Sequence, residues 1–211
     1  MLIGATGLTG GHLLRRLCAD RRYAEIHVLA RRALSLRSRR LRIHVVDFNR
    51  IPSRHPAFYV NHVFCCLGTT IRQAGTREQF HKVDYLYSMQ VARAALQGGA
   101  ETLVVVSAMG ADPRSRNFYL RTKGKLEKDL AELTYRRLVI VRPSLLIGQR
   151  ESPRPMETLG MWVLPKLTFL MQGPLKPYRA IAADTVAGAM HRLAWLEGSG
   201  TRVVLSDQLQ A

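Results

Sequence analysis

Short apolar segments alternate with longer amphipathic segments along this chain. The short segments are mostly continuous runs of β-branched and aliphatic residues, which is typical of strands buried on both faces of a parallel sheet. They lie at residues 2–3, 25–30, 41–46, 62–67, 102–107, 138–141 and 202–205. Strands that alternate with helices predict the α/β class, with a doubly wound, mostly parallel sheet and helices on both faces. The strand at 2–3 is much shorter than the usual five or six residues.

Four longer segments have the pattern and the end signals of helices. One begins after residue 10, and the others span about 76–98, 117–135 and 184–198. The second has the clearest ends, because Thr76 and Gln79 form a capping box and two glycines follow the helix. Asp184 is expected to cap the last helix. Between residues 50 and 59, two prolines and a weak pattern predict that a crossover helix is reduced or missing.

Length and composition fit one globular domain. Of the 211 residues, 47% are hydrophobic and 22% are charged, so residues 1–211 are expected to form a single domain. The most apolar stretch, 159–171, contains Pro165 and Lys166 and is too short to cross a bilayer, so no membrane insertion is expected. Met1 is followed within three residues by a glycine-rich turn, which leaves no room for a targeting leader, and we expect a cytoplasmic location.

The cysteines and histidines predict neither disulfides nor a metal site. The number of cysteines is odd, and Cys65 and Cys66 are neighbours in an apolar run, which indicates core packing. The seven histidines are scattered and no C-x-x-C occurs, so we expect no bound metal.

The chain is strongly basic, with a net charge of +17. Residues 1–54 contain 12 Arg and only three acidic residues, so about half of the excess lies in the first quarter of the chain. Such an excess can attract an anionic cofactor, bind nucleic acid or acidic membrane without specificity, or reflect a general preference for Arg over Lys. No array of aromatic and basic residues suited to base stacking is present, so no specific nucleic-acid partner is expected.

A glycine-rich turn follows the first predicted strand and precedes the first predicted helix. Its glycines are suited to a tight bend, to a close approach of the backbone to phosphates, and to packing of the helix on the strand. The sequence therefore predicts a Rossmann-type domain that binds the pyrophosphate of a dinucleotide, with a tight turn that holds no ligand as the alternative. The predicted contacts are Gly4, Thr6, Gly7, Leu8, Thr9 and Gly10.

Two arginines end the second predicted strand. At this position an NAD-specific site usually has an acidic residue that binds the ribose 2′-hydroxyl, whereas this chain has Arg31 and Arg32. A guanidinium group can bind a 2′-phosphate with two hydrogen bonds, so NADP(H) is the expected cofactor. The alternative is that both arginines belong to the solvated basic surface.

A tyrosine and a lysine four residues apart lie on the third predicted helix, twelve residues after a serine at the end of a strand. Residues four apart share a helix face, so Tyr119 and Lys123 can point into one site near Ser107. A cation beside a phenol lowers the pKa of the phenol towards working pH, which makes Tyr119 a candidate general acid and base. The spacing alone also occurs by chance, with a purely structural role.

These residues resemble the short-chain dehydrogenase/reductase superfamily, and more narrowly its atypical branch related to the Tat-interacting protein. The resemblance covers nearly the whole chain. It is carried by motifs at residues 4–10, 64–70, 107–112, 118–119, 123–124 and 142–144. It implies that Ser107 binds a substrate carbonyl, that Tyr119 donates the proton, and that Lys123 holds the nicotinamide ribose.

The same resemblance implies further cofactor contacts. Asp47 would meet the adenine, and the end of the fourth strand and the segment after the sixth would lie against the cofactor. These last contacts are Leu67, Gly68, Thr69, Pro143 and Ser144. Two features depart from the family. Asp84 stands where the superfamily often has Asn, and the segment available for substrate contacts, at about 148–180, is short.

The expected function is therefore an NADP(H)-dependent oxidoreductase that transfers hydride to or from a small carbonyl or alcohol substrate by means of Ser107, Tyr119 and Lys123. The alternative is a regulatory or sensor protein that binds NADPH with little or no turnover. A role based on nucleic-acid binding depends on charge alone. Both a monomer and a homodimer are compatible with the sequence.

Overall fold

A computed structural model describes residues 1–52, 54–148 and 179–210. Its core is a seven-stranded sheet in which every pair of neighbouring strands is parallel. The strand order is β3-β2-β1-β4-β5-β6-β9. The strands are β1 (Leu2–Ile3), β2 (Ile26–Ala30), β3 (Leu41–Val45), β4 (His62–Cys65), β5 (Thr102–Val106), β6 (Arg137–Arg142) and β9 (Gly200–Leu205). All seven predicted strands are present, and the doubly wound Rossmann-type sheet is confirmed.

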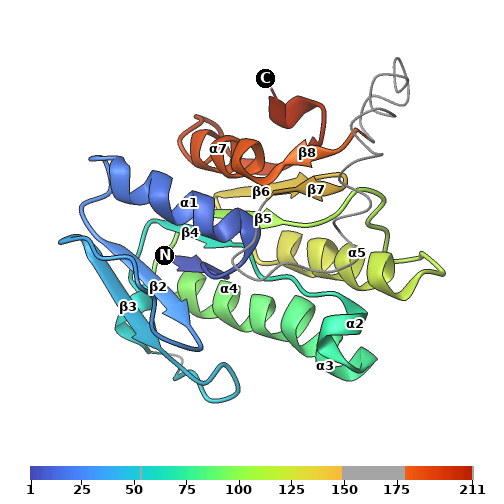
Figure 1. Cartoon of the computed structure of the whole chain (residues 1–211), viewed down its shortest axis with the longest axis horizontal. Helices are drawn as coiled ribbons and strands as arrows, with labels where there is room; N and C mark the ends of the chain where they lie inside the picture. Colours follow the sequence, from blue (N-terminus) through green and yellow to red (C-terminus); the bar gives the residue numbers. More distant parts are fainter. Residues whose placement is uncertain (53, 149–178, 211) are drawn as a thin grey trace.

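Helices cover both faces of this sheet (Figure 1). On one face, α1 (Leu8–Ala19) and α7 (Ala183–Leu193) pack over a core that includes Leu13 and Val186. On the other face, α4 (Tyr87–Gln97) and α5 (Phe118–Ala131) pack over a second core that includes Leu126. The order of strands reverses between β1 and β4, and in such sheets ligands bind beyond the carboxyl ends of the strands at this point.

The expected weak crossover lies between β3 and β4. Here the chain forms only the 3-10 turn η1 (Pro56–Phe58), which begins with a proline, as expected where the proline ring fixes the first turn. Two short strands, β7 (Leu146–Ile147) and β8 (Ile181–Ala182), form a separate parallel sheet, and the 3-10 turn η4 (Gln208–Gln210) follows β9. The substrate segment expected at 148–180 lies almost entirely outside the described residues.

Two helices differ from their expected form. The helix expected over 76–98 is a succession of α3 (Arg77–His81), the π-turn η2 (Lys82–Leu86) and α4, preceded by the single turn α2 (Ile71–Ala74). The predicted cap by Asp184 is wrong, because α7 begins one residue earlier and Asp184 forms an ion pair with Arg16 of α1 at 2.7 Å. Within the described ranges, no helix is long and apolar enough to span a membrane.

Candidate functional site

The glycine turn between β1 and α1 requires glycine at two positions, at one for its backbone conformation and at both for lack of space. Gly4 has a φ of +82°, and a Cβ there would lie 2.4 Å from the carbonyl of Cys66. A Cβ on Gly10 would lie 2.1 Å from the Gly4 carbonyl oxygen. The turn is therefore pressed against the end of β4, where the Cys66 amide donates to the Ile3 carbonyl at 3.0 Å.

The start of α1 fits the pyrophosphate of a dinucleotide. Gly7 is the N-cap residue and has no side chain that could bind the first amides of the helix. These amides lack partners within the helix and carry the positive end of its dipole, which favours an anion. Within the same turn, the buried Thr9 hydroxyl has no hydrogen-bond partner in the part of the chain that the structure describes. The residues present therefore match the predicted cofactor.

The end of β4 brings the loop at Gly68 to the helix that carries Lys123. A Cβ on Gly68 would lie 3.9 Å from the Lys123 Nζ and 3.8 Å from the Asp84 Oδ1, in ordinary van der Waals contact. The amide of the next residue, Thr69, donates to the Asp84 Oδ2 at 2.9 Å. The predicted cofactor segment after β4 and the predicted catalytic lysine are thus neighbours in space.

Tyr119 and Lys123 lie on the first turns of α5. Asn117 caps this helix, because its side chain accepts a hydrogen bond from the Leu120 amide at 3.2 Å. Lys123 is 2% exposed, and its Nζ forms an ion pair with the Asp84 Oδ1 at 2.7 Å. Burial alone would lower the pKa of Lys123, but the negative charge of Asp84 and the neighbouring Tyr119 outweigh it and the pKa is raised.

The acidity of Tyr119 differs from expectation. Burial raises the pKa of Tyr119 above its ordinary value of 10, Lys123 lowers it, and Asp84 raises it again. The net shift is upward, so the expected lowering of the Tyr119 pKa towards working pH is wrong. The physical reason is that the sequence argument included the charge of Lys123 but not the burial of the phenol or the charge of Asp84.

The Ser107 hydroxyl forms its hydrogen bond with a residue outside the Tyr119-Lys123 pair. It donates to the Glu127 carboxylate, one turn beyond Lys123 on α5. Glu127 is itself buried and accepts hydrogen bonds from two nitrogens of Arg142: Nε donates to Oε1 at 3.0 Å and to Oε2 at 3.2 Å, and Nη2 donates to Oε2 at 2.5 Å. Among the described residues, no hydrogen bond joins Ser107 to Tyr119 or Lys123. The predicted trio therefore falls into two clusters, a Tyr119-Lys123-Asp84 cluster and a Ser107-Glu127-Arg142 cluster.

The other predicted cofactor residues lie at carboxyl ends of strands. Arg31 and Arg32 follow β2, are exposed, and take part in no ion pair that the described residues form. Asp47 follows β3, and its carboxylate accepts hydrogen bonds from the backbone and side chain of Asn49, which lower its pKa. The arginines are therefore free to bind a phosphate, whereas the Asp47 carboxylate is already hydrogen-bonded within its own turn.

The segment after β6 is tied to two neighbouring parts of the fold. The Pro143 carbonyl accepts a hydrogen bond from the Met109 amide at 3.0 Å. The Ser144 hydroxyl donates to the Arg179 carbonyl and lies 3.0 Å from the Ser206 hydroxyl. These bonds fix the position of the residues that were expected beside the nicotinamide.

Comparison with known proteins places the chain in a family. The family model described as HIM1 matches residues 43–173. The chain belongs to the HIM1 family. A relative of this HIM1-family chain, Protein HTATIP2 of Rattus norvegicus, is 32% identical over 98% of this chain and 85% of its own length. Another, the mitochondrial Protein FMP52 of Debaryomyces hansenii, is 37% identical over 72% of this chain and 68% of its own length. The predicted resemblance to an atypical short-chain dehydrogenase/reductase is confirmed.

Solved structures show the same fold as this HIM1-family chain. MoeE5 in complex with UDP-glucuronic acid and NAD has a TM-score of 0.75 at 20% identity, over 96% of this chain and 74% of its own. The UDP-glucose 4-epimerase of Thermus thermophilus in complex with NAD has a TM-score of 0.65 at 18% identity, over 99% of this chain and 80% of its own. At these identities the likeness shows the fold.

The expected cytoplasmic location is contradicted. Relatives of this HIM1-family chain in Debaryomyces hansenii, Saccharomyces cerevisiae and Candida glabrata are named mitochondrial proteins. The sequence argument considered only the few residues before the glycine turn, and these carry no information on the compartment of the relatives.

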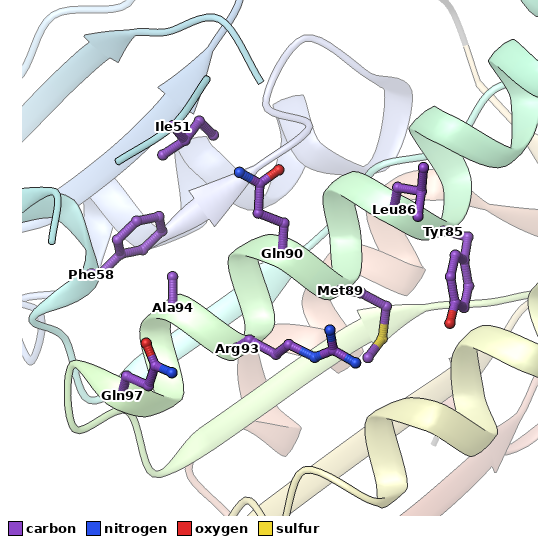
Figure 2. A pocket seen from close by; sticks show the side chains of 9 residues that line it. All are labelled: Ile51, Phe58, Tyr85, Leu86, Met89, Gln90, Arg93, Ala94 and Gln97. Atoms are coloured by element: carbon purple, nitrogen blue, oxygen red, sulfur yellow. The ribbon is translucent and has the colours of Figure 1, made fainter. Parts of the chain in front are cut away.

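The pocket beside α4 lies apart from the predicted site residues of the HIM1-family chain. This pocket of about 460 Å³ lies against the side of α4 that includes Met89 and Arg93, and none of the predicted site residues lines it (Figure 2). In the described ranges, no group of three His, Cys, Asp or Glu side chains could hold a metal ion.

Proposed function

We propose that this HIM1-family chain is an NADP(H)-dependent oxidoreductase that transfers hydride between the cofactor and a small carbonyl or alcohol substrate. One observation supports this most: Lys123 is buried beside Gly68 and Tyr119, in the loop region that follows β4, and the glycine turn packs against the end of this same strand. A Tyr-x-x-x-Lys pair with a purely structural role would not need to lie beside the loop at the end of β4. The expected catalytic pair and the expected cofactor segment belong to one site in this proposal.

The cofactor would be held by parts of the chain that follow successive strands. The glycine turn and the start of α1 would bind the pyrophosphate, and Arg31 and Arg32 would bind the 2′-phosphate. Asp47 would lie beside the adenine. The nicotinamide half would lie against Leu67, Gly68, Thr69, Pro143 and Ser144. A bound nicotinamide dinucleotide supplies the hydride, which no side chain of the protein can provide.

Tyr119 would transfer the proton. In reduction, its hydroxyl donates a proton to the substrate oxygen as that oxygen gains negative charge, and Lys123 stabilises the phenolate that remains. Ser107 was expected to bind the substrate carbonyl, but that role requires its hydroxyl to leave Glu127. We therefore assign proton transfer to Tyr119 and Lys123, and treat substrate binding by Ser107 as a separate hypothesis.

The alternative function is an NADPH-binding regulatory protein with little turnover. It is favoured by the bond of Ser107 to Glu127, since this bond keeps the Ser107 hydroxyl from binding a substrate carbonyl. The two functions share the cofactor site and differ in the fate of the hydride.

A calorimetric titration followed by a turnover assay tests both functions. The purified chain is titrated with NADPH and NADH, and then incubated with NADPH and a panel of small aldehydes and ketones. The oxidoreductase proposal predicts tighter binding of NADPH and cofactor oxidation that depends on a carbonyl compound. Tight binding without oxidation across the panel would support the regulatory function. Absence of binding to both cofactors would overturn both.

A further inference from the structure

A π-turn interrupts the long helical segment that contains α3 and α4. The π-turn η2 covers Lys82–Leu86 and adds one residue to the helical turn. Such turns are rare and occur frequently at functional sites. Asp84 is fully buried within η2, whereas Leu86 is 47% exposed and lines the pocket beside α4 (Figure 2). The π-turn thus directs an acidic side chain into the protein interior.

Both carboxylate oxygens of Asp84 are fixed by other elements. Oδ1 lies 2.7 Å from the Nζ of Lys123 on α5. Oδ2 accepts a hydrogen bond of 2.9 Å from the amide of Thr69, which lies in the loop after β4. Lys123 is buried almost as completely as Asp84. Because a buried ion pair is poorly screened by water, the two charges act strongly on each other and on their neighbours. Asp84 therefore holds the Lys123 ammonium in one place.

Tyr119 is the neighbour that these two charges influence. Its ring packs against Phe80 of α3, with ring centroids 5.6 Å apart, and the charged groups that act on it are Lys123 and Asp84. Lys123 faces one further titratable group, the buried thiol of Cys65. Lys123 lowers the pKa of Tyr119, whereas burial and Asp84 raise it. The negative charge of Asp84 therefore offsets the effect that the positive charge of Lys123 has on the Tyr119 phenol.

We propose that Asp84 is a positioning residue that fixes and balances Lys123, keeps the proton on Tyr119, and so extends carbonyl reduction to higher pH. This inference rests on the proposed function. In reduction the carbonyl carbon gains a hydride from the reduced nicotinamide dinucleotide, and the carbonyl oxygen gains the Tyr119 proton. The phenolate that remains beside Lys123 then takes a proton from solvent. Alcohol oxidation needs the deprotonated tyrosine at the start, which Asp84 disfavours.

Titration of the tyrosines by NMR tests the effect of Asp84 without any turnover. The full chain is labelled with ¹³C at the tyrosine Cζ, and the Tyr119 signal is assigned with the Tyr119→Phe variant. In Asp84→Asn the pKa of Tyr119 should fall by about one pH unit or more, because the charge of Lys123 is no longer balanced. In Lys123→Met it should rise. The double variant, which lacks both charges, should lie between the two single variants.

The same spectra contain a matched control. On the protein surface Tyr85 donates to Asp129, and Lys125 lies 2.8 Å from the Asp129 carboxylate, so this trio repeats the residue types of the buried one. Asp129→Asn should lower the pKa of Tyr85, which Asp129 raises, and should leave Tyr119 unchanged. A change at Tyr119 in this control of the same size as in Asp84→Asn would overturn the specific role of Asp84.

Folding of the variants is checked by their amide spectra, since Asp84→Asn leaves Lys123 buried without its partner. If Asp84→Asn does not fold, the comparison of Lys123→Met with the double variant replaces it, and Tyr119 should titrate at lower pH in the double variant. An unchanged Tyr119 in the folded variants would overturn the inference. Absence of turnover with every carbonyl compound, together with the predicted tyrosine shifts, would instead overturn only the proposed function.

The pH profile of turnover gives the functional consequence. In Asp84→Asn, the kcat of alcohol oxidation should reach its maximum at lower pH than in the unmodified chain, and the kcat of carbonyl reduction should begin to fall at lower pH. Asp129→Asn should leave both profiles in place. An Asp84→Asn variant that loses both directions equally, with no displacement of either profile, would show only a structural role for Asp84.

Discussion

The Ser107 hydroxyl donates a hydrogen bond to the Glu127 carboxylate, which also accepts hydrogen bonds from two nitrogens of Arg142. This cluster joins the end of β5, the middle of α5 and the end of β6. Ser107 and Glu127 are buried, at 4% and 6% exposed, whereas the Arg142 side chain is 26% exposed. Removing one partner of a buried charged group leaves part of that charge without compensation, so the cluster is expected to stabilise the fold.

Ser107→Ala should lower the free energy of unfolding by about 1.5–3 kcal/mol, because Glu127 loses a charged hydrogen bond. Urea denaturation measures this change. Thr122→Val is the matched control, because the Thr122 hydroxyl donates to the uncharged Phe118 carbonyl, and it should cost less than about 1.5 kcal/mol. Loss of turnover in Ser107→Ala with unchanged stability would contradict the structural role and favour the substrate role expected from the sequence.

Gly10→Ala should weaken NADPH binding and lower the free energy of unfolding by at least about 2 kcal/mol, because the added Cβ would meet the Gly4 carbonyl oxygen at 2.1 Å. The adjacent Gly11→Ala is the matched control. Its Cβ would lie 3.6 Å from the Ala5 carbonyl oxygen, and alanine stabilises a helix by about 0.5–1 kcal/mol relative to glycine. Equal losses of binding in both variants would show that the close contact with Gly4 is irrelevant.

Arg31→Ala combined with Arg32→Ala should weaken NADPH binding by about ten- to a hundredfold, because charged hydrogen bonds to the 2′-phosphate are lost. NADH binding should change little, because NADH has no 2′-phosphate. Calorimetry with both cofactors measures the difference, and Arg37→Ala, another exposed arginine of the same basic segment, serves as the control. A parallel loss for both cofactors would assign the arginines to nonspecific attraction.

Stability should fall as the pH drops from about 6.5 towards 4, in part because of His62. Burial lowers the pKa of His62 from 6.5 to about 4, with the positive charges of the amino terminus and Arg137 adding to the shift. The unfolded chain therefore takes up a proton in this range before the folded chain does, which favours unfolding. His62→Gln should flatten the change in melting temperature over this range. Identical profiles for His62→Gln and the unmodified chain would refute this assignment.

Much of the architecture could be predicted from local patterns. Most of the strands are continuous apolar runs, and the prolines between 50 and 59 correctly indicated that only a short turn crosses from β3 to β4. The π-turn could not be predicted in this way, because one extra residue within a helical pattern leaves its apolar stripe almost unchanged. Asp84 was noted only as a departure from the family, and its buried pairing with Lys123 depends on contacts between three elements.

The direction of Ser107 also required the structure. Successive side chains of a strand point to opposite faces, so a shift of one residue at the end of β5 decides whether a hydroxyl faces Glu127 or the expected substrate. The sequence identified the serine at the strand end and the Tyr119-Lys123 pair on the next helix. It did not contain the information that Glu127, one turn beyond Lys123, accepts the serine hydrogen bond.

The most direct test of the proposed function is the rate of NADPH oxidation with an active carbonyl compound in the unmodified chain and in Tyr119→Phe. The phenylalanine keeps the ring beside Phe80 and removes only the hydroxyl that would donate the proton. Loss of the general acid should reduce the rate by about a hundredfold or more, while NADPH binding by calorimetry stays the same. A Tyr119→Phe variant that binds NADPH and turns over at the unmodified rate would contradict the assignment of Tyr119 as the proton donor.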